Sequence, residues 1–111
     1  MRFMMMTSND PKVEMTPPSP EMYAEMGKLI EEMTRAGVLL ATGGLEATPT
    51  RVKSSNGKFE IMDGPFTEAK EAVVGFALIE AKSREEAIEF ARRFWKVAGN
   101  GQGSIYEVFG G

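Results

Sequence analysis

Two stretches of the chain carry apolar residues at the spacing of a helix face. In the first stretch the apolar positions form one stripe: Met22, Met26, Leu29, Ile30 and Met33. Such a stripe is typical of a helix packed on a core. A methionine-rich stripe could also form a pliable binding surface, but methionine fills core gaps so readily that core packing is the favoured interpretation. Ser19 suits the N-cap, Pro20 the first turn and Gly37 the end of this helix.

The second helical stretch opens with a capping box, Ser83-x-x-Glu86. The residues expected on its buried side are Ile88, Ala91, Phe94, Trp95 and Ala98. These positions share one face of a helix, so the pattern predicts a second amphipathic helix.

Four other segments are predicted to be strands, and they run from Arg2 to Thr7, Val38 to Thr42, Val73 to Glu80 and Ser104 to Phe109. The third of them is apolar at nearly every position rather than at alternate ones. A strand of that kind is typical of the centre of a sheet that is covered on both faces.

A hairpin is predicted between the second and third of these strands. Asn56-Gly57 favours the type I′ turn of a two-residue hairpin. The register that follows places Lys53 opposite Glu60 and Val52 opposite Ile61, which gives one opposite-charge pair and one apolar pair.

The order of the elements predicts an α+β fold. When the hairpin is left out, the elements follow the order strand, helix, strand, strand, helix, strand. This order is the split βαβ pattern of ferredoxin-like folds, in which two helices lie on one face of an antiparallel sheet. We expect residues 1–111 to form a single domain. Because two helices cover only one face, the apolar second face predicts a symmetric partner chain and hence a homodimer.

Composition removes several kinds of function. The net charge is −3 and the 13 basic residues are scattered, so we expect no nucleic-acid partner. No apolar stretch is long enough for a membrane span, and we expect a cytoplasmic protein. The sequence contains neither cysteine nor histidine, so we expect no metal or other cofactor. Acid–base chemistry then falls to a carboxylate, a lysine or a tyrosine.

The tetrapeptide Asp63-Gly64-Pro65-Phe66 stands before Lys70-Glu71 and Gly75. Together with Thr50-Arg51-Val52 before the hairpin and the run from Gly103 to Val108 at the end, it resembles the signature of DGPF-domain proteins, which are related to the YCII family. The resemblance spans nearly the whole chain. It implies a dimeric α/β barrel with a pocket between sheet and helices or at the dimer seam.

The resemblance also suggests where a ligand binds. Asp63 is the catalytic candidate, and the expected ligand contacts are Leu45, Arg51, Gly64, Pro65, Phe66, Lys70 and Glu107. Tyr106 and Glu107 are adjacent on the last strand, and alternation alone leaves open which of them faces inward. Two departures matter: the histidine of the catalytic dyad suggested for YCII relatives is absent, and Phe109 stands where many DGPF-domain proteins have an arginine.

Two roles remain open for Asp63. Counting in twos along the hairpin places it on the face of Phe59 and Ile61, which predicts that its carboxylate points toward the core. It could cap the turn by accepting hydrogen bonds from the amides of Phe66 or Thr67, or it could act as an acid–base group.

These observations support two hypotheses of function. The favoured one is a small-molecule-binding accessory or regulatory protein, which could act by binding a regulatory partner protein. The alternative is a metal-free isomerase, lyase or dehydrochlorinase that acts on a small cyclic or acidic substrate with Asp63 as its acid–base residue. Fold analogy does not choose between them.

Overall fold

A computed structural model describes residues 1–9, 12, 14, 16–46, 48–62 and 72–110. Within these residues it contains the following elements in chain order: β1 (Arg2–Asn9), α1 (Pro20–Arg35), β2 (Leu39–Gly44), β3 (Arg51–Ser55), β4 (Lys58–Met62), β5 (Ala72–Glu80), α2 (Arg84–Ala98) and β6 (Gln102–Val108). The predicted order of elements is confirmed.

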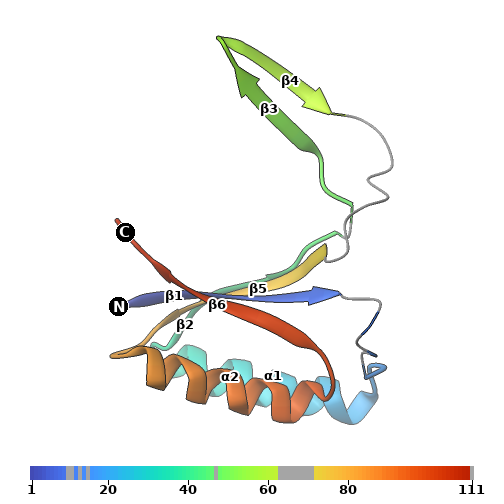
Figure 1. Cartoon of the computed structure of the whole chain (residues 1–111). Coiled ribbons are helices and arrows are strands. Elements are labelled where there is room, and N and C mark those ends of the chain that lie inside the picture. Colours follow the sequence, from blue (N-terminus) through green and yellow to red (C-terminus); the bar gives the residue numbers. More distant parts are fainter. Residues whose placement is uncertain (10–11, 13, 15, 47, 63–71, 111) are drawn as a thin grey trace.

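Four strands form one antiparallel sheet in the order β2-β5-β1-β6. The strand β5 lies between β1 and β2, which is the split βαβ arrangement that the sequence predicted. Both helices lie on the same face of this sheet (Figure 1). The α+β, ferredoxin-like fold is therefore confirmed, with β1 and β5 at its centre.

Both predicted helix starts are present. The hydroxyl of Ser19 accepts a hydrogen bond from the Met22 amide at 3.1 Å, and the hydroxyl of Ser83 accepts one from the Glu86 amide at 3.2 Å. Each satisfies one of the amides that the first turn of a helix leaves without an intrahelical partner. Gly37 has a positive φ of 74°, a conformation that favours glycine and ends α1.

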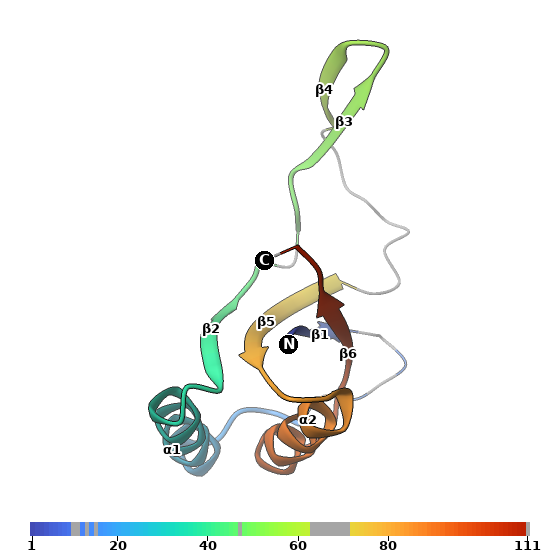
Figure 2. The same ribbon diagram turned by 90° about the vertical axis from the view of Figure 1, so that its left-hand side faces the viewer.

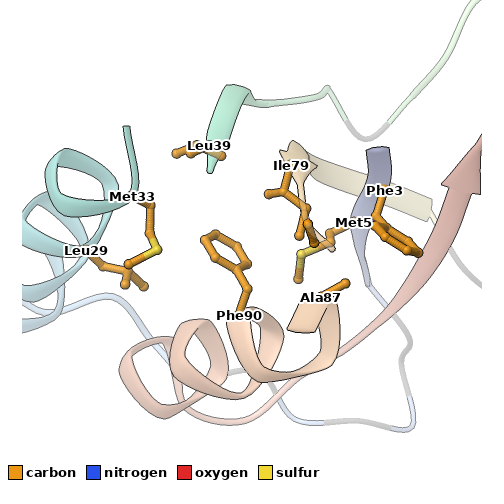
Figure 3. Close-up of a cluster of buried hydrophobic side chains, with 9 residues drawn as sticks. Phe3, Met5, Leu29, Met33, Leu39, Ile79, Ala87 and Phe90 are labelled. Atoms are coloured by element: carbon orange, nitrogen blue, oxygen red, sulfur yellow. The ribbon is translucent and has the colours of Figure 1, made fainter. Parts of the chain in front are cut away.

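The core lies between the helices and the sheet (Figure 3). Phe3 of β1 and Ile79 of β5 are directly opposite each other and fully buried. The helices add Leu29 and Met33 from α1 and Phe90 from α2, which points into the centre of the cluster. The methionine stripe of α1 is thus partly core, as expected.

The predicted buried side of α2 is confirmed at Ala91 and Phe94 and wrong at Ile88. Ile88 was expected to be buried but is exposed, whereas Ala87 and Phe90 are buried. Ala87, Phe90, Ala91 and Phe94 follow the spacing i, i+3, i+4, i+7 and form the face that meets the sheet. Successive helix residues are about 100° apart, so Ile88 points away from that face.

No described helix lies over the other face of the sheet (Figure 1). Phe3 and Met5 point toward the helices, so Met4 and Met6 point the opposite way because side chains alternate along a strand. We call this surface the open face, and it consists of Met4, Met6, Phe76, Leu78 and Tyr106, none of which is buried. The predicted second apolar face is therefore present.

The hairpin of β3 and β4, which we call the arm, forms a separate two-stranded sheet. Its register matches the prediction at every pair, including Val52 with Ile61 and Lys53 with Glu60. Positive φ angles at Asn56 and Gly57 agree with the expected turn. The arm stands away from the large sheet and the two helices, on the side of the sheet opposite those helices (Figures 1 and 2).

One expectation about the arm was wrong. Its apolar face was predicted to lie against the core, but Val52, Phe59 and Ile61 are 57%, 68% and 58% exposed. The two strands pair with each other and with no other described strand, so the arm forms a sheet of its own whose two outer edges keep outward-pointing backbone groups. The arm therefore gives no support to the prediction that Asp63 points toward the core, and Asp63 itself lies outside the described residues.

Phe3→Ala should lower the free energy of unfolding by about 3–5 kcal/mol, because it removes a fully buried ring and leaves a cavity. Tyr23→Ala is the matched control, since Tyr23 is 67% exposed on α1, and it should change stability by less than about 0.5 kcal/mol. Urea denaturation followed by circular dichroism measures both. Similar losses in the two variants would contradict this description of the core.

Candidate functional site

A cavity of about 270 Å³ lies between the helices and the sheet. It takes residues from both helices and from the four strands of the large sheet. Each of the following described residues contributes side-chain or backbone atoms to its lining: Met5, Met6, Thr7, Met26, Leu29, Ile30, Leu39, Thr42, Gly43, Gly75, Phe76, Ala77, Phe90, Ala91, Phe94, Trp95, Gly103, Ser104 and Ile105.

Two glycines help to explain why the sheet is hollow here and filled elsewhere. Thr7 of β1 has Gly75 opposite it on β5 and Gly103 opposite it on β6. A Cβ atom on Gly75 would lie 2.8 Å from the Thr7 hydroxyl oxygen. A Cβ atom on Gly103 would lie 2.5 Å from the Met6 carbonyl oxygen and 3.5 Å from Cζ2 of Trp95. With no side chain at either position, the end of the sheet around Thr7 leaves space beneath the helices.

Aromatic rings of α2 form one wall of the cavity. Phe90, Phe94 and Trp95 all line it, and the rings of Phe94 and Trp95 stack with centroids 5.1 Å apart and an interplanar angle of 13°. Aromatic side chains offer large flat surfaces for contact with another ring. This wall therefore suits a planar apolar molecule.

Polar groups in the lining are few. Thr7 and Thr42 bring hydroxyl groups, and the Thr42 hydroxyl donates to the Phe76 carbonyl oxygen at 2.9 Å. Its proton is thus engaged, which leaves the oxygen available as an acceptor. Ser104 pairs with Met6, so its side chain lies on the open face. None of the described lining residues carries a charged side chain. A few placed polar groups in an apolar enclosure are typical of small-molecule sites.

The structure does not bring the described candidate residues into this cavity. Leu45 follows β2, is exposed and donates its amide to the Val74 carbonyl oxygen at 2.9 Å. Arg51 is the first residue of the arm. Glu107 pairs with Phe3 and therefore lies on the helix side, whereas Tyr106 pairs with Met4 on the open face. The remaining candidates, Asp63, Gly64, Pro65, Phe66 and Lys70, lie outside the described residues.

The cavity residues themselves were not singled out as a site by the sequence analysis. Phe94 and Trp95 were assigned to the buried side of a helix, which is correct but incomplete. The signal that could have found the cavity is glycine inside a strand, which marks a close approach or a missing side chain. Gly75 and Gly103 both carry that signal.

A profile of the YCII-related domain family matches residues 1–110. The chain belongs to the YCII-related family. The resemblance seen in the sequence is thereby confirmed over almost the whole chain.

Two individual proteins are similar to all or part of this YCII-related chain. An uncharacterised protein of Rhizobium meliloti (strain 1021) is 49% identical over 41 residues, which span 37% of this chain and 33% of that protein. The chain thus matches about a third of its length. A 5-chloro-2-hydroxyhydroquinone dehydrochlorinase from Burkholderia phenoliruptrix AC1100, solved with 2,5-dihydroxybenzoquinone, has a TM-score of 0.48 and 13% identity, covering 100% of this chain and 96% of that one.

Two further properties concern the described part of this YCII-related protein. No helix there is long and apolar enough to cross a membrane. No group of three or more acidic side chains gathers there in a way that could hold a metal ion.

Gly103→Ala should destabilise the protein by about 1–3 kcal/mol, because the added methyl group would press on the backbone of β1. Gly27→Ala is the matched control. No atom lies within 4 Å of a Cβ there, and the residue is in the middle of α1, so alanine should stabilise by about 0.5–1 kcal/mol. Urea denaturation gives both values, and a neutral Gly103→Ala would show that the sheet tolerates a side chain at this point.

Proposed function

We propose that this YCII-related protein binds a small, uncharged, largely apolar organic molecule in the cavity between its helices and its sheet. The cavity with its aromatic wall is the observation that carries this proposal. The protein would then serve as an accessory or regulatory protein that responds to its ligand, alone or through a partner protein.

Volume supports a ligand of one or two rings. An apolar cavity of about 150 Å³ is enough to hold benzene. The present cavity is about 270 Å³, which leaves space for a ring with substituents. The hydroxyl groups of Thr7 and Thr42 would then fix the orientation of a hydroxyl or carbonyl group on the ligand.

Charge supports a neutral ligand. Burying an ionised group without an opposite charge or several hydrogen bonds is strongly unfavourable. The described lining offers hydroxyl groups but no cation and no carboxylate. An acidic molecule, one of the two substrate types considered from the sequence, is therefore disfavoured in this cavity.

The enzyme alternative depends on Asp63. The described lining residues include no carboxylate, lysine or tyrosine, so an acid–base group would have to come from elsewhere in the chain. Asp63 as that group, in an isomerase, lyase or dehydrochlorinase, stays a prediction. Binding is favoured over catalysis because the described lining supplies what binding needs.

We also propose that the protein is a homodimer. Met4, Met6, Phe76, Leu78 and Tyr106 form a continuous set of neighbours in the sheet register, and no described element covers them. Apolar sheet faces of this kind are stabilised by packing on a second sheet, and two-fold dimers are the commonest assemblies.

Phenol should bind in the cavity and benzoate should not, because the two share a ring but only benzoate is charged at pH 7. We expect phenol to bind at least about tenfold more tightly, a difference of about 1.4 kcal/mol. Methyl NMR of the methionines measures this directly. The signals of Met5 and Met26, which line the cavity, should shift with phenol, and that of Met62 on the arm should not.

Ala91→Leu supplies the control for location. Ala91 lines the cavity, so a leucine there should fill part of it and abolish the phenol shifts. Ala24→Leu makes the same change at an exposed position of α1 and should leave them intact. Tighter binding of benzoate, or phenol shifts that survive Ala91→Leu, would sink the proposed site.

A further inference from the structure

The arm is a two-stranded hairpin of a kind that needs packing against another surface to be stable. Its strands Arg51–Ser55 and Lys58–Met62 pair only with each other in the described part of the chain. A two-stranded hairpin alone in water is marginally stable at best, and it needs further strands or packing to persist. Its register and turn are nevertheless those of a regular hairpin.

The two faces of the arm differ in character. Val52, Ser54, Phe59 and Ile61 share one face, because Val52 pairs with Ile61 and Ser54 with Phe59. The opposite face carries Arg51, Lys53, Ser55, Lys58, Glu60 and Met62. An apolar face so strongly exposed, backed by a charged one, is typical of an interaction surface rather than of a solvated hairpin.

The arm also differs in charge from the rest of the molecule. Three basic side chains, Arg51, Lys53 and Lys58, against the carboxylate of Glu60 give residues 51–62 a net charge of +2. The whole chain carries −3, so the remainder carries −5. The arm of one copy and the body of another thus carry opposite net charges, and a charge pattern of this kind guides the encounter of two molecules more than it adds to their affinity.

The position of the arm also favours a second copy of this chain as its binding partner. The arm rises on the side of the sheet opposite the helices, which is the side of the open face (Figures 1 and 2). Two copies that meet through their open faces would each project an arm toward the other. The strands of the arm have five residues each, or about 17 Å, whereas packed sheets are about 10 Å apart, so each arm would reach past the partner's sheet.

We infer that the arm embraces a second copy of this chain, with the face formed by Val52, Phe59 and Ile61 packed against the edge of the partner's sheet. The inference rests on the proposed homodimer and extends it. The open faces supply one contact, and the two arms supply a second that is related by the same two-fold axis. It makes no use of the cavity, so the ligand proposal stands or falls separately.

Cross-linking tests the arm directly, since the chain has no cysteine of its own. Ser54→Cys places a unique thiol on the apolar face, and Ser55→Cys places the same thiol on the charged face one residue away. Each variant carries a maleimide–benzophenone probe and is irradiated as a mixture of ordinary and ¹⁵N-labelled copies. Mass spectrometry then separates inter-chain from intra-chain products.

Both variants should sediment at twice the chain mass of 12.2 kDa. Ser54→Cys should give inter-chain products in several-fold greater yield than Ser55→Cys, attached to peptides of an edge strand, β2 or β6. A dimer whose products are equal for the two variants, or only intra-chain, would overturn the arm contact and leave the dimer standing. A monomer would overturn both the arm contact and the dimer, and a different protein would then be the candidate partner of the arm.

A second measurement does not depend on the probe. Phe59→Ser should raise the dimer dissociation constant at least about tenfold, since an exposed aromatic ring of this kind is a typical interface anchor. Tyr23→Ser is the matched control, because Tyr23 is similarly exposed but lies on the helix side of the sheet. An unchanged dissociation constant for Phe59→Ser would remove the arm from the interface.

Discussion

Phe3 and Ile79 lie opposite each other on the two central strands, and both side chains are fully buried. The burial of this pair determines which face of each central strand packs against the helices. Their pairing fixes the register of β1 against β5, and a slip of one residue would turn every side chain of a strand to the other face. In this register Met5 joins the core, while Met4 and Leu78 face away from the helices. The core, the cavity and the open face are thus consequences of one alignment.

The cavity shows how the same sheet face can be both filled and hollow. Near Phe3 and Ile79, large side chains occupy the space between sheet and helices. Near Thr7, Gly75 and Gly103 contribute no side chain, and the aromatic rings of α2 are left facing a gap. The side chains that line this gap lack some of the dispersion contacts that a filled core would give them. A bound ring would restore them, which gives the proposed ligand a physical source of affinity.

The chain presents more apolar surface than its two helices cover. The open face and the arm are on the same side of the sheet (Figure 2). In a single chain the apolar side chains of the arm are exposed, whereas those of the open face are half-buried apart from the exposed Tyr106. Burial of exposed apolar surface is the main favourable term in protein association. A symmetric dimer would bury both surfaces together, and the ligand cavity would remain on the outer, helix-covered side of each copy.

Local chemistry in the sequence determined the elements themselves: the capping serines Ser19 and Ser83, the Asn56-Gly57 turn with its register, and the central position of β5. These features depend on residues near one another in the chain, so a single sequence is enough to predict them. Only the tertiary structure decided which face of α2 is buried, that the arm leaves the sheet, and that Gly75 and Gly103 flank Thr7 above a cavity. Those outcomes depend on packing between segments far apart in the sequence, and neither periodicity nor turn chemistry encodes which segments will meet.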